Sequence, residues 1–122
     1  SVEEDPDDDR NMHYLGREYM FKGRWQDCID TLKKHLAMPS AVWKDERAAS
    51  MRFIAKSSYN LGRKKEAVLW YMSAICEAPH LREGYSDLAR LLYTEKEWEG
   101  VIYFASQGLE IKARPACYIC EA

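Results

Sequence analysis

The sequence predicts an all-α protein built as a short right-handed superhelix of stacked helix-turn-helix repeats, with about seven helices. Three observations predict this fold. Apolar residues recur three and four positions apart over segments long enough for a helix. A turn residue, usually Gly, separates the two segments of each pair, and a Pro closes the first two pairs. The same arrangement of small and large residues then returns twice along the chain.

The clearest repeat spans residues 48–81 and has one apolar stripe before a central glycine and one after it. The stripes and their boundaries are formed by Met51, Ile54, Ala55, Gly62, Ala67, Tyr71, Ala74 and Pro79. This pattern resembles the tetratricopeptide repeat, in which small residues, a central Gly, an aromatic residue and a final Pro recur over 34 residues. The resemblance implies stacked helix pairs whose first helices line a concave binding face.

Two further copies flank the central repeat, at about residues 9–39 and 82–114. Asp8 or Asp9 is positioned to cap the first helix of the chain. The small residue Ala55 is matched by Gly16 and Ala89, where a short side chain lets two helices approach closely. Residues 115–122 are predicted to form a truncated fourth repeat or a capping helix.

An insertion separates the first two copies, since Gly16 and Ala55 are 39 residues apart rather than 34. We expect residues 40–47 to extend the third helix from Ser40 onward, in preference to forming a loop, because no Gly or Pro interrupts them. Trp43 is then expected to cover an end of the neighbouring helix.

Composition excludes several classes of protein. Residues 1–8 form an acidic arm that is expected to be disordered, and residues 10–122 carry 18 basic against 14 acidic groups. This excess is too small and too dispersed to predict nucleic-acid binding. No apolar run is long enough to insert in a membrane. Four cysteines without a secretory signal, with Cys28 and Cys76 in apolar stripes, favour a reduced, cytoplasmic protein.

Basic residues in phase with the repeat mark the candidate binding site. Arg17, Lys56 and Arg90 each follow the small residue of their repeat, so stacking is expected to place them in a column. The remaining predicted groove residues are Arg10, Tyr14, Arg52, Phe53, Tyr59 and Tyr93. Such a groove suits an acidic peptide or a phosphate-bearing surface. Two alternatives stay open: the bases pair with acids such as Glu18, Glu83 or Asp87, or the acidic arm occupies the groove.

Particular phrases resemble a narrower family. They are Asp9-Arg10, His13-Tyr14-Leu15-x-Arg17-Glu18-Tyr19, Gly23-x-Trp25, Leu36-Ala37-x-Pro39, Trp43-x-Asp45-Glu46-Arg47, Arg52-x-Ile54-Ala55, Trp70-Tyr71-x-x-Ala74 and Glu77-Ala78-Pro79-x-x-Arg82-Glu83. These are similar to the helical repeat region that follows the catalytic domain of bacterial family 2 glycosyltransferases. The resemblance implies a non-catalytic scaffold for acceptor recognition or assembly, with the catalytic domain as a partner in cis, and it carries over no catalytic residue. The activity of the parent protein stays open.

The alternative is a freestanding peptide-binding adaptor or co-chaperone. In tetratricopeptide domains that clamp acidic carboxy-terminal peptides, the clamp needs Lys, Asn and Arg, and the matching positions here are His13, Arg17, Phe53, Glu83 and Asp87. The two Asn are missing, which disfavours a chaperone peptide. Cys117-x-x-Cys120 offers half of a zinc site at most, so no metal, cofactor or catalytic residue is predicted. The ligand and the oligomeric state stay open.

Overall fold

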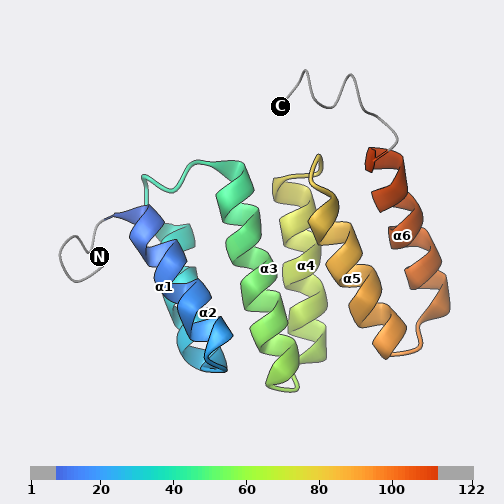
Figure 1. Ribbon diagram of the computed structural model, residues 1–122, viewed down its shortest axis with the longest axis horizontal. Coiled ribbons are helices and arrows are strands. Elements are labelled where there is room, and N and C mark those ends of the chain that lie inside the picture. Colours follow the sequence, from blue (N-terminus) through green and yellow to red (C-terminus); the bar gives the residue numbers. More distant parts are fainter. Residues whose placement is uncertain (1–7, 113–122) are drawn as a thin grey trace.

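The computed structural model describes residues 8–112, and this part of the chain contains six helices and no strand. The helices are α1 (Asp9–Phe21), α2 (Trp25–Ala37), α3 (Lys44–Asn60), α4 (Lys64–Glu77), α5 (Arg82–Thr94) and α6 (Trp98–Lys112). They stand side by side as three antiparallel pairs in chain order (Figure 1). The predicted all-α stack of helix pairs is confirmed. The acidic arm through residue 7 and the predicted last helix lie outside the described residues.

Local signals set several helix boundaries. The Asp8 carboxylate caps α1, since Oδ1 accepts from the backbone N–H of Arg10 at 2.9 Å and of Asn11 at 3.4 Å. Gly23 and Gly62 end the turns after α1 and α3 with φ of +76° and +82°, a region open to glycine at little cost. The predictions of this cap and of both turn glycines are therefore confirmed.

Small residues let the helices of each pair approach closely. Gly16 is buried, and a Cβ at this position would collide with the side chain of Leu32 on α2. Its counterparts Ala55 and Ala89 are buried as well, and so is Ala67 on α4. The core therefore forms along the seams between neighbouring helices, as expected for repeats that each contact only their neighbours.

The start of α3 differs from the expectation. The helix begins at Lys44 rather than at Ser40, so only part of the insertion lengthens it, to 17 residues against 13 in α1 and in α5. Trp43 precedes the first helical residue with its side chain 57% exposed, so it does not cover the end of a neighbouring helix. The expectation for Trp43 was wrong.

A side-chain contact holds the segment before α3 in a non-helical conformation. The guanidinium of Arg47 donates from Nη1 to the carbonyl oxygens of Leu36 and Ala41, at 2.9 Å each. Ala41 itself is buried, so this connecting segment is held against the protein. Backbone groups in residues 38–43 thus form hydrogen bonds with Arg47 and within local turns, and not the regular hydrogen bonds of a helix.

Two further expectations concern cysteines and membranes. Cys28 is a buried free cysteine, whereas Cys76 is free and lies on an exposed apolar face of α4 beside Leu69 and Met72. Cys117 and Cys120 lie outside the described residues. Among the helices that the structure describes, none is long and apolar enough to cross a bilayer.

Candidate functional site

A groove lies between α3 and α5, and we call it the polar groove because most of its lining residues carry a charge or a hydroxyl group, although apolar atoms make up much of its surface. Its volume is about 150 Å³. It is lined by Lys56, Tyr59, Tyr71, Asp87, Arg90, Leu91 and Thr94. The structure therefore brings together three of the residues that the sequence predicted for a groove: Lys56, Tyr59 and Arg90. Tyr71 and Asp87 were not predicted as groove residues.

A second hollow lies beside the first, between α5 and α6, and has a volume of about 450 Å³. It is lined by Arg82, Ser86, Ala89, Arg90, Tyr93, Val101, Ala105, Gly108 and Leu109. Arg90 and Tyr93 were predicted, whereas the wall from α6 was missed. The small residues Ala105 and Gly108 were the sequence signal that could have predicted the α6 wall, because they leave space beside larger apolar side chains.

Arg90 belongs to both hollows. Its side chain is 74% exposed, and its Nη1 lies 3.8 Å from Oδ1 of Asp87 one turn earlier. An ion pair this long and this open to water contributes little. Arg90 is therefore available to an anion on either side of it.

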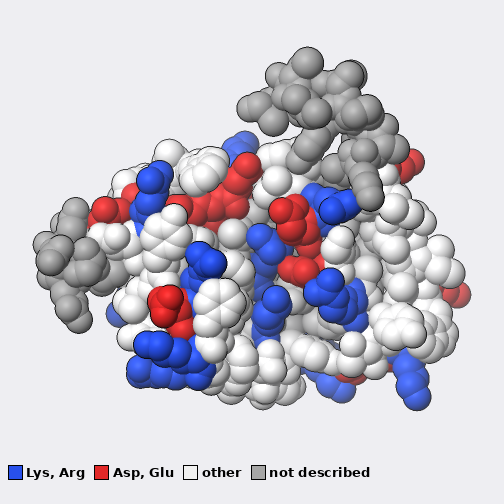
Figure 2. All heavy atoms as spheres, viewed as in Figure 1, with Lys and Arg blue, Asp and Glu red and all other residues white. Residues whose placement is uncertain are grey.

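The neighbouring bases differ in how strongly they are paired. Nη1 of Arg52 lies 3.3 Å from Oδ2 of Asp87, and the Arg52 side chain is only 18% exposed. The alternative prediction, that a base pairs with a nearby acid, is correct for Arg52. Lys56 has no acidic partner within the described residues. Lys and Arg side chains gather across the middle of the face formed by α1, α3 and α5, with acidic side chains among them (Figure 2).

The predicted residues on α1 do not line either hollow. The Arg17 guanidinium lies over the ring of Phe21, 5.2 Å from its centre, and Arg10 and Tyr14 are exposed. Phe53 is partly buried, and its ring stacks with that of His13 at 5.7 Å. The structure thus places Lys56 and Arg90 at one site and leaves Arg17 apart from it.

Two tyrosines, Tyr59 and Tyr71, line the polar groove, and the hydroxyl of Tyr59 is already used within the domain. The Tyr59 hydroxyl donates to Glu95 at 2.7 Å, which raises the pKa of Tyr59, while Lys64 lies 2.8 Å from the same carboxylate. The hydrogen bonds from Lys64 and then from Tyr59 lower the pKa of Glu95. Burial raises the pKa of Tyr71. The hydroxyl proton of Tyr59 is thus donated to Glu95, so the cations Lys56 and Arg90 are the groups of this groove that suit binding of anionic oxygen atoms.

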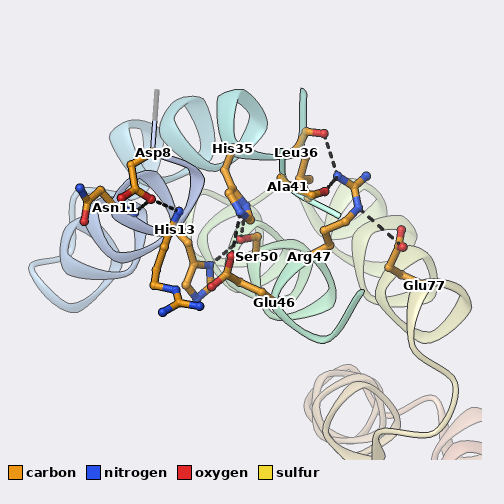
Figure 3. A network of polar contacts seen from close by, with 11 residues as sticks. Asp8, Asn11, His13, His35, Leu36, Ala41, Glu46, Arg47, Ser50 and Glu77 are labelled. Atoms are coloured by element: carbon orange, nitrogen blue, oxygen red, sulfur yellow. Dashed lines mark hydrogen bonds and ion pairs between the residues drawn. The ribbon is translucent and has the colours of Figure 1, made fainter. Parts of the chain in front are cut away.

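A buried polar network between the first two repeats was not predicted. The Oγ of Ser50 lies 2.7 Å from Nδ1 of His13 and 2.8 Å from Nδ1 of His35, and Nε2 of His35 lies 3.3 Å from Oε1 of Glu46 (Figure 3). Burial, followed by the charges of His35, Arg17 and Arg52, lowers the pKa of His13 to about 4. The only sequence signal was the presence of polar residues on predicted helices.

No protein-family model matches the chain, and no curated protein matches it in sequence. Solved structures do match it. Pseudomonas aeruginosa PilF superposes with a TM-score of 0.75 at 14% identity, over 89% of this chain and 48% of PilF. The protein MamA matches with a TM-score of 0.72 at 20% identity, over 92% of this chain and 58% of MamA.

A third match is a kinesin light chain of Podospora anserina, described as having nearly identical TPR-like repeats. Its TM-score is 0.65 at 22% identity, over 86% of this chain and 55% of the kinesin light chain. The chain thus spans about half the length of the solved structures it matches. At these identities the likeness concerns the fold. The described domain has the fold of tetratricopeptide-type helical repeats.

Proposed function

We propose that this domain is a protein-interaction scaffold that binds a peptide segment carrying an acidic side chain next to an apolar one. The observation that carries the proposal is the position of Arg90, which is exposed where the polar groove meets the apolar hollow. A carboxylate at Arg90 and Lys56 places the adjacent side chain of the same peptide against α6.

Charge supports the anionic preference. Asp87 is already paired with the partly buried Arg52, so its charge is largely compensated within the domain. Lys56 and Arg90 then leave an excess of positive charge at the groove. A peptide that covers Arg90 excludes water from the contact, and a charge-assisted hydrogen bond to a carboxylate then contributes about 1.5 to 3 kcal/mol. The apolar hollow adds affinity through burial of apolar surface.

The sequence phrases support a narrower proposal about the setting. On their likeness to the repeat region of bacterial family 2 glycosyltransferases, we propose that the scaffold belongs to a cytoplasmic enzyme of that kind and holds an acceptor or the catalytic domain in cis. The second candidate, a freestanding adaptor, is distinguished by the full-length gene product. A transferase domain encoded before Ser1 supports the first setting, and a short open reading frame supports the second.

The binding proposal is tested by selecting peptides from a random library on the 122-residue chain and measuring affinities by fluorescence anisotropy. We expect selected peptides to contain Asp or Glu beside an apolar residue. Arg90→Glu and Lys56→Glu are each expected to weaken binding by at least about tenfold, or about 1.4 kcal/mol. Lys65→Glu is the matched control, because Lys65 is exposed in the first turn of α4, where a carboxylate favours the helix.

A synthetic peptide of residues 1–8 belongs in the same assay, because the acidic arm is itself a candidate occupant. Binding of this peptide in trans, lost in Arg90→Glu, identifies the arm as a competitor for the groove. Selected peptides that lack acids, or that bind the two groove variants as tightly as Lys65→Glu, contradict the proposed site.

A further inference from the structure

We propose that Asp9, His35 and Glu46 bind a divalent metal ion of the Zn²⁺ type where the first repeat joins the second. The three residues come from α1, α2 and α3, and their ligand atoms all lie within 4.8 Å of one another. His35 is fully buried, Glu46 is buried and Asp9 is half-buried. This cluster is separate from the groove of Lys56 and Arg90, so it gives the domain a second site.

The spacing of the donor atoms suits a shared ion. Nε2 of His35 and Oε1 of Glu46 are 3.3 Å apart, longer than a typical charge-assisted hydrogen bond of about 2.7 to 2.9 Å. Two ligands held about 2.1 Å from a tetrahedral ion lie about 3.4 Å from each other. The separation of His35 and Glu46 therefore matches one edge of a tetrahedral site, and the Asp9 carboxylate, within 4.8 Å of both atoms, has to move closer to complete it.

The hydrogen-bond chain behind His35 orients its ring for metal binding. The Ser50 hydroxyl has one proton and lies between Nδ1 of His35 and Nδ1 of His13 (Figure 3). When the Ser50 hydroxyl donates its proton to Nδ1 of His13, its oxygen accepts a hydrogen bond from Nδ1–H of His35. Nε2 of His35 is then unprotonated, and its lone pair is free to bind a metal ion beside Glu46. A second hydrogen bond of this kind is the usual support of a metal-binding imidazole.

The negative charges of the cluster also favour binding of a cation. Asp9 and Glu46 are two carboxylates beside one imidazole, in a place where burial penalises uncompensated charge. Arg47 follows Glu46 but donates to the carbonyls of Leu36 and Ala41 and lies 3.6 Å from Glu77. A divalent ion compensates both carboxylates.

The donor set indicates the kind of metal. One imidazole with two carboxylates suits Zn²⁺. Three protein ligands leave a fourth position for water or for a group of a binding partner. No metal was predicted from the sequence, because the three ligands are not close in the sequence and meet only when α1, α2 and α3 pack together.

The test is a calorimetric titration of the 122-residue chain with ZnCl₂, in a background with Cys76→Ser, Cys117→Ser and Cys120→Ser that removes competing thiols. We expect one ion per chain. Asp9→Asn and Glu46→Gln each remove a ligand at nearly constant volume and are expected to weaken Zn²⁺ binding by at least about tenfold. Asp30→Asn is the matched control, since Asp30 is an exposed carboxylate on α2.

Co²⁺ provides an independent readout, as its visible absorption reports a low-symmetry site with nitrogen and oxygen ligands. The absorption is expected in the control and is expected to be lost in Asp9→Asn. Circular dichroism verifies folding, and Asp9→Asn decides alone if Glu46→Gln does not fold. If Zn²⁺ binds both ligand variants as tightly as Asp30→Asn, or does not bind the parent chain, His35 and Glu46 form a structural hydrogen bond only.

Discussion

Two buried serines of α3, Ser50 and Ser58, differ in whether their hydroxyl groups form hydrogen bonds. Both side chains are shielded from solvent. Ser50 joins the rings of His13 and His35, whereas the Oγ of Ser58 has no hydrogen-bond partner in the part of the chain that the structure describes. Loss of the Ser50 hydroxyl therefore leaves two buried ring nitrogens without a partner, and loss of the Ser58 hydroxyl leaves none.

We expect Ser50→Ala to lower the free energy of unfolding by about 2 to 3 kcal/mol, because two buried ring nitrogens then lack the hydrogen bonds that offset their loss of hydration. Ser58→Ala is the matched control and is expected to be neutral or slightly stabilising. Urea denaturation followed by circular dichroism measures both. Equal effects of the two substitutions would show that the His13–Ser50–His35 network contributes no net stability.

At the scale of the elements, the three helix-turn-helix turns share one backbone conformation but not one residue type. Gly23 and Gly62 take positive φ in the first two repeats, and Lys96 takes φ of 62° in the third. A residue with a Cβ is strained in this region, by about 1 to 2 kcal/mol. The third turn therefore has the same backbone geometry as the other two, but Lys96 pays a conformational strain energy there that Gly23 and Gly62 do not.

Lys96→Gly is expected to stabilise the protein by about 1 kcal/mol, less than the full strain because glycine also loses more entropy on folding. Lys96→Ala is the control, since it removes the side chain while keeping the strained Cβ, and it is expected to change little. Thermal unfolding measures the difference, which corresponds to about 2 to 5 °C for a chain of this size. A glycine variant no more stable than the alanine variant would contradict this account.

Across the whole molecule, the helices differ in how many neighbours support them. Within the described residues α3 packs against α1, α2, α4 and α5, whereas α6 packs against α5 alone. Large apolar side chains of α6 also remain exposed, namely Trp98, Ile102, Tyr103 and Leu109. In a repeat stack each helix is stabilised by its immediate neighbours, so stability is expected to fall from α3 toward α6.

Hydrogen exchange followed by mass spectrometry tests this gradient. Backbone amides of α6 are expected to exchange fastest among the six helices, and those of α3 slowest, because local opening of α6 disrupts a single seam. The other end of the described stack is the internal control: α1 packs against two helices and is expected to be intermediate. Protection of α6 equal to that of α3 would contradict the gradient and show that a further segment or subunit covers α6.

The sequence by itself determined the repeats, and with them most of the fold. Gly16, Ala55 and Ala89 predicted the close helix contacts, and Gly23 and Gly62 the turns, because these features depend on residues within one turn or one helix pair. The same register selected Lys56 and Arg90, which do share a groove.

Tertiary structure decided which polar groups meet. Asp87 compensates Arg52 across the α3–α5 seam, Ser50 joins two histidines from α1 and α2, and Arg47 holds the segment before α3 in a non-helical conformation. Apolar periodicity indicates which face of a helix is buried. It does not indicate which charge on one helix lies opposite which charge on the next, because that depends on the offset and angle at which the helices pack.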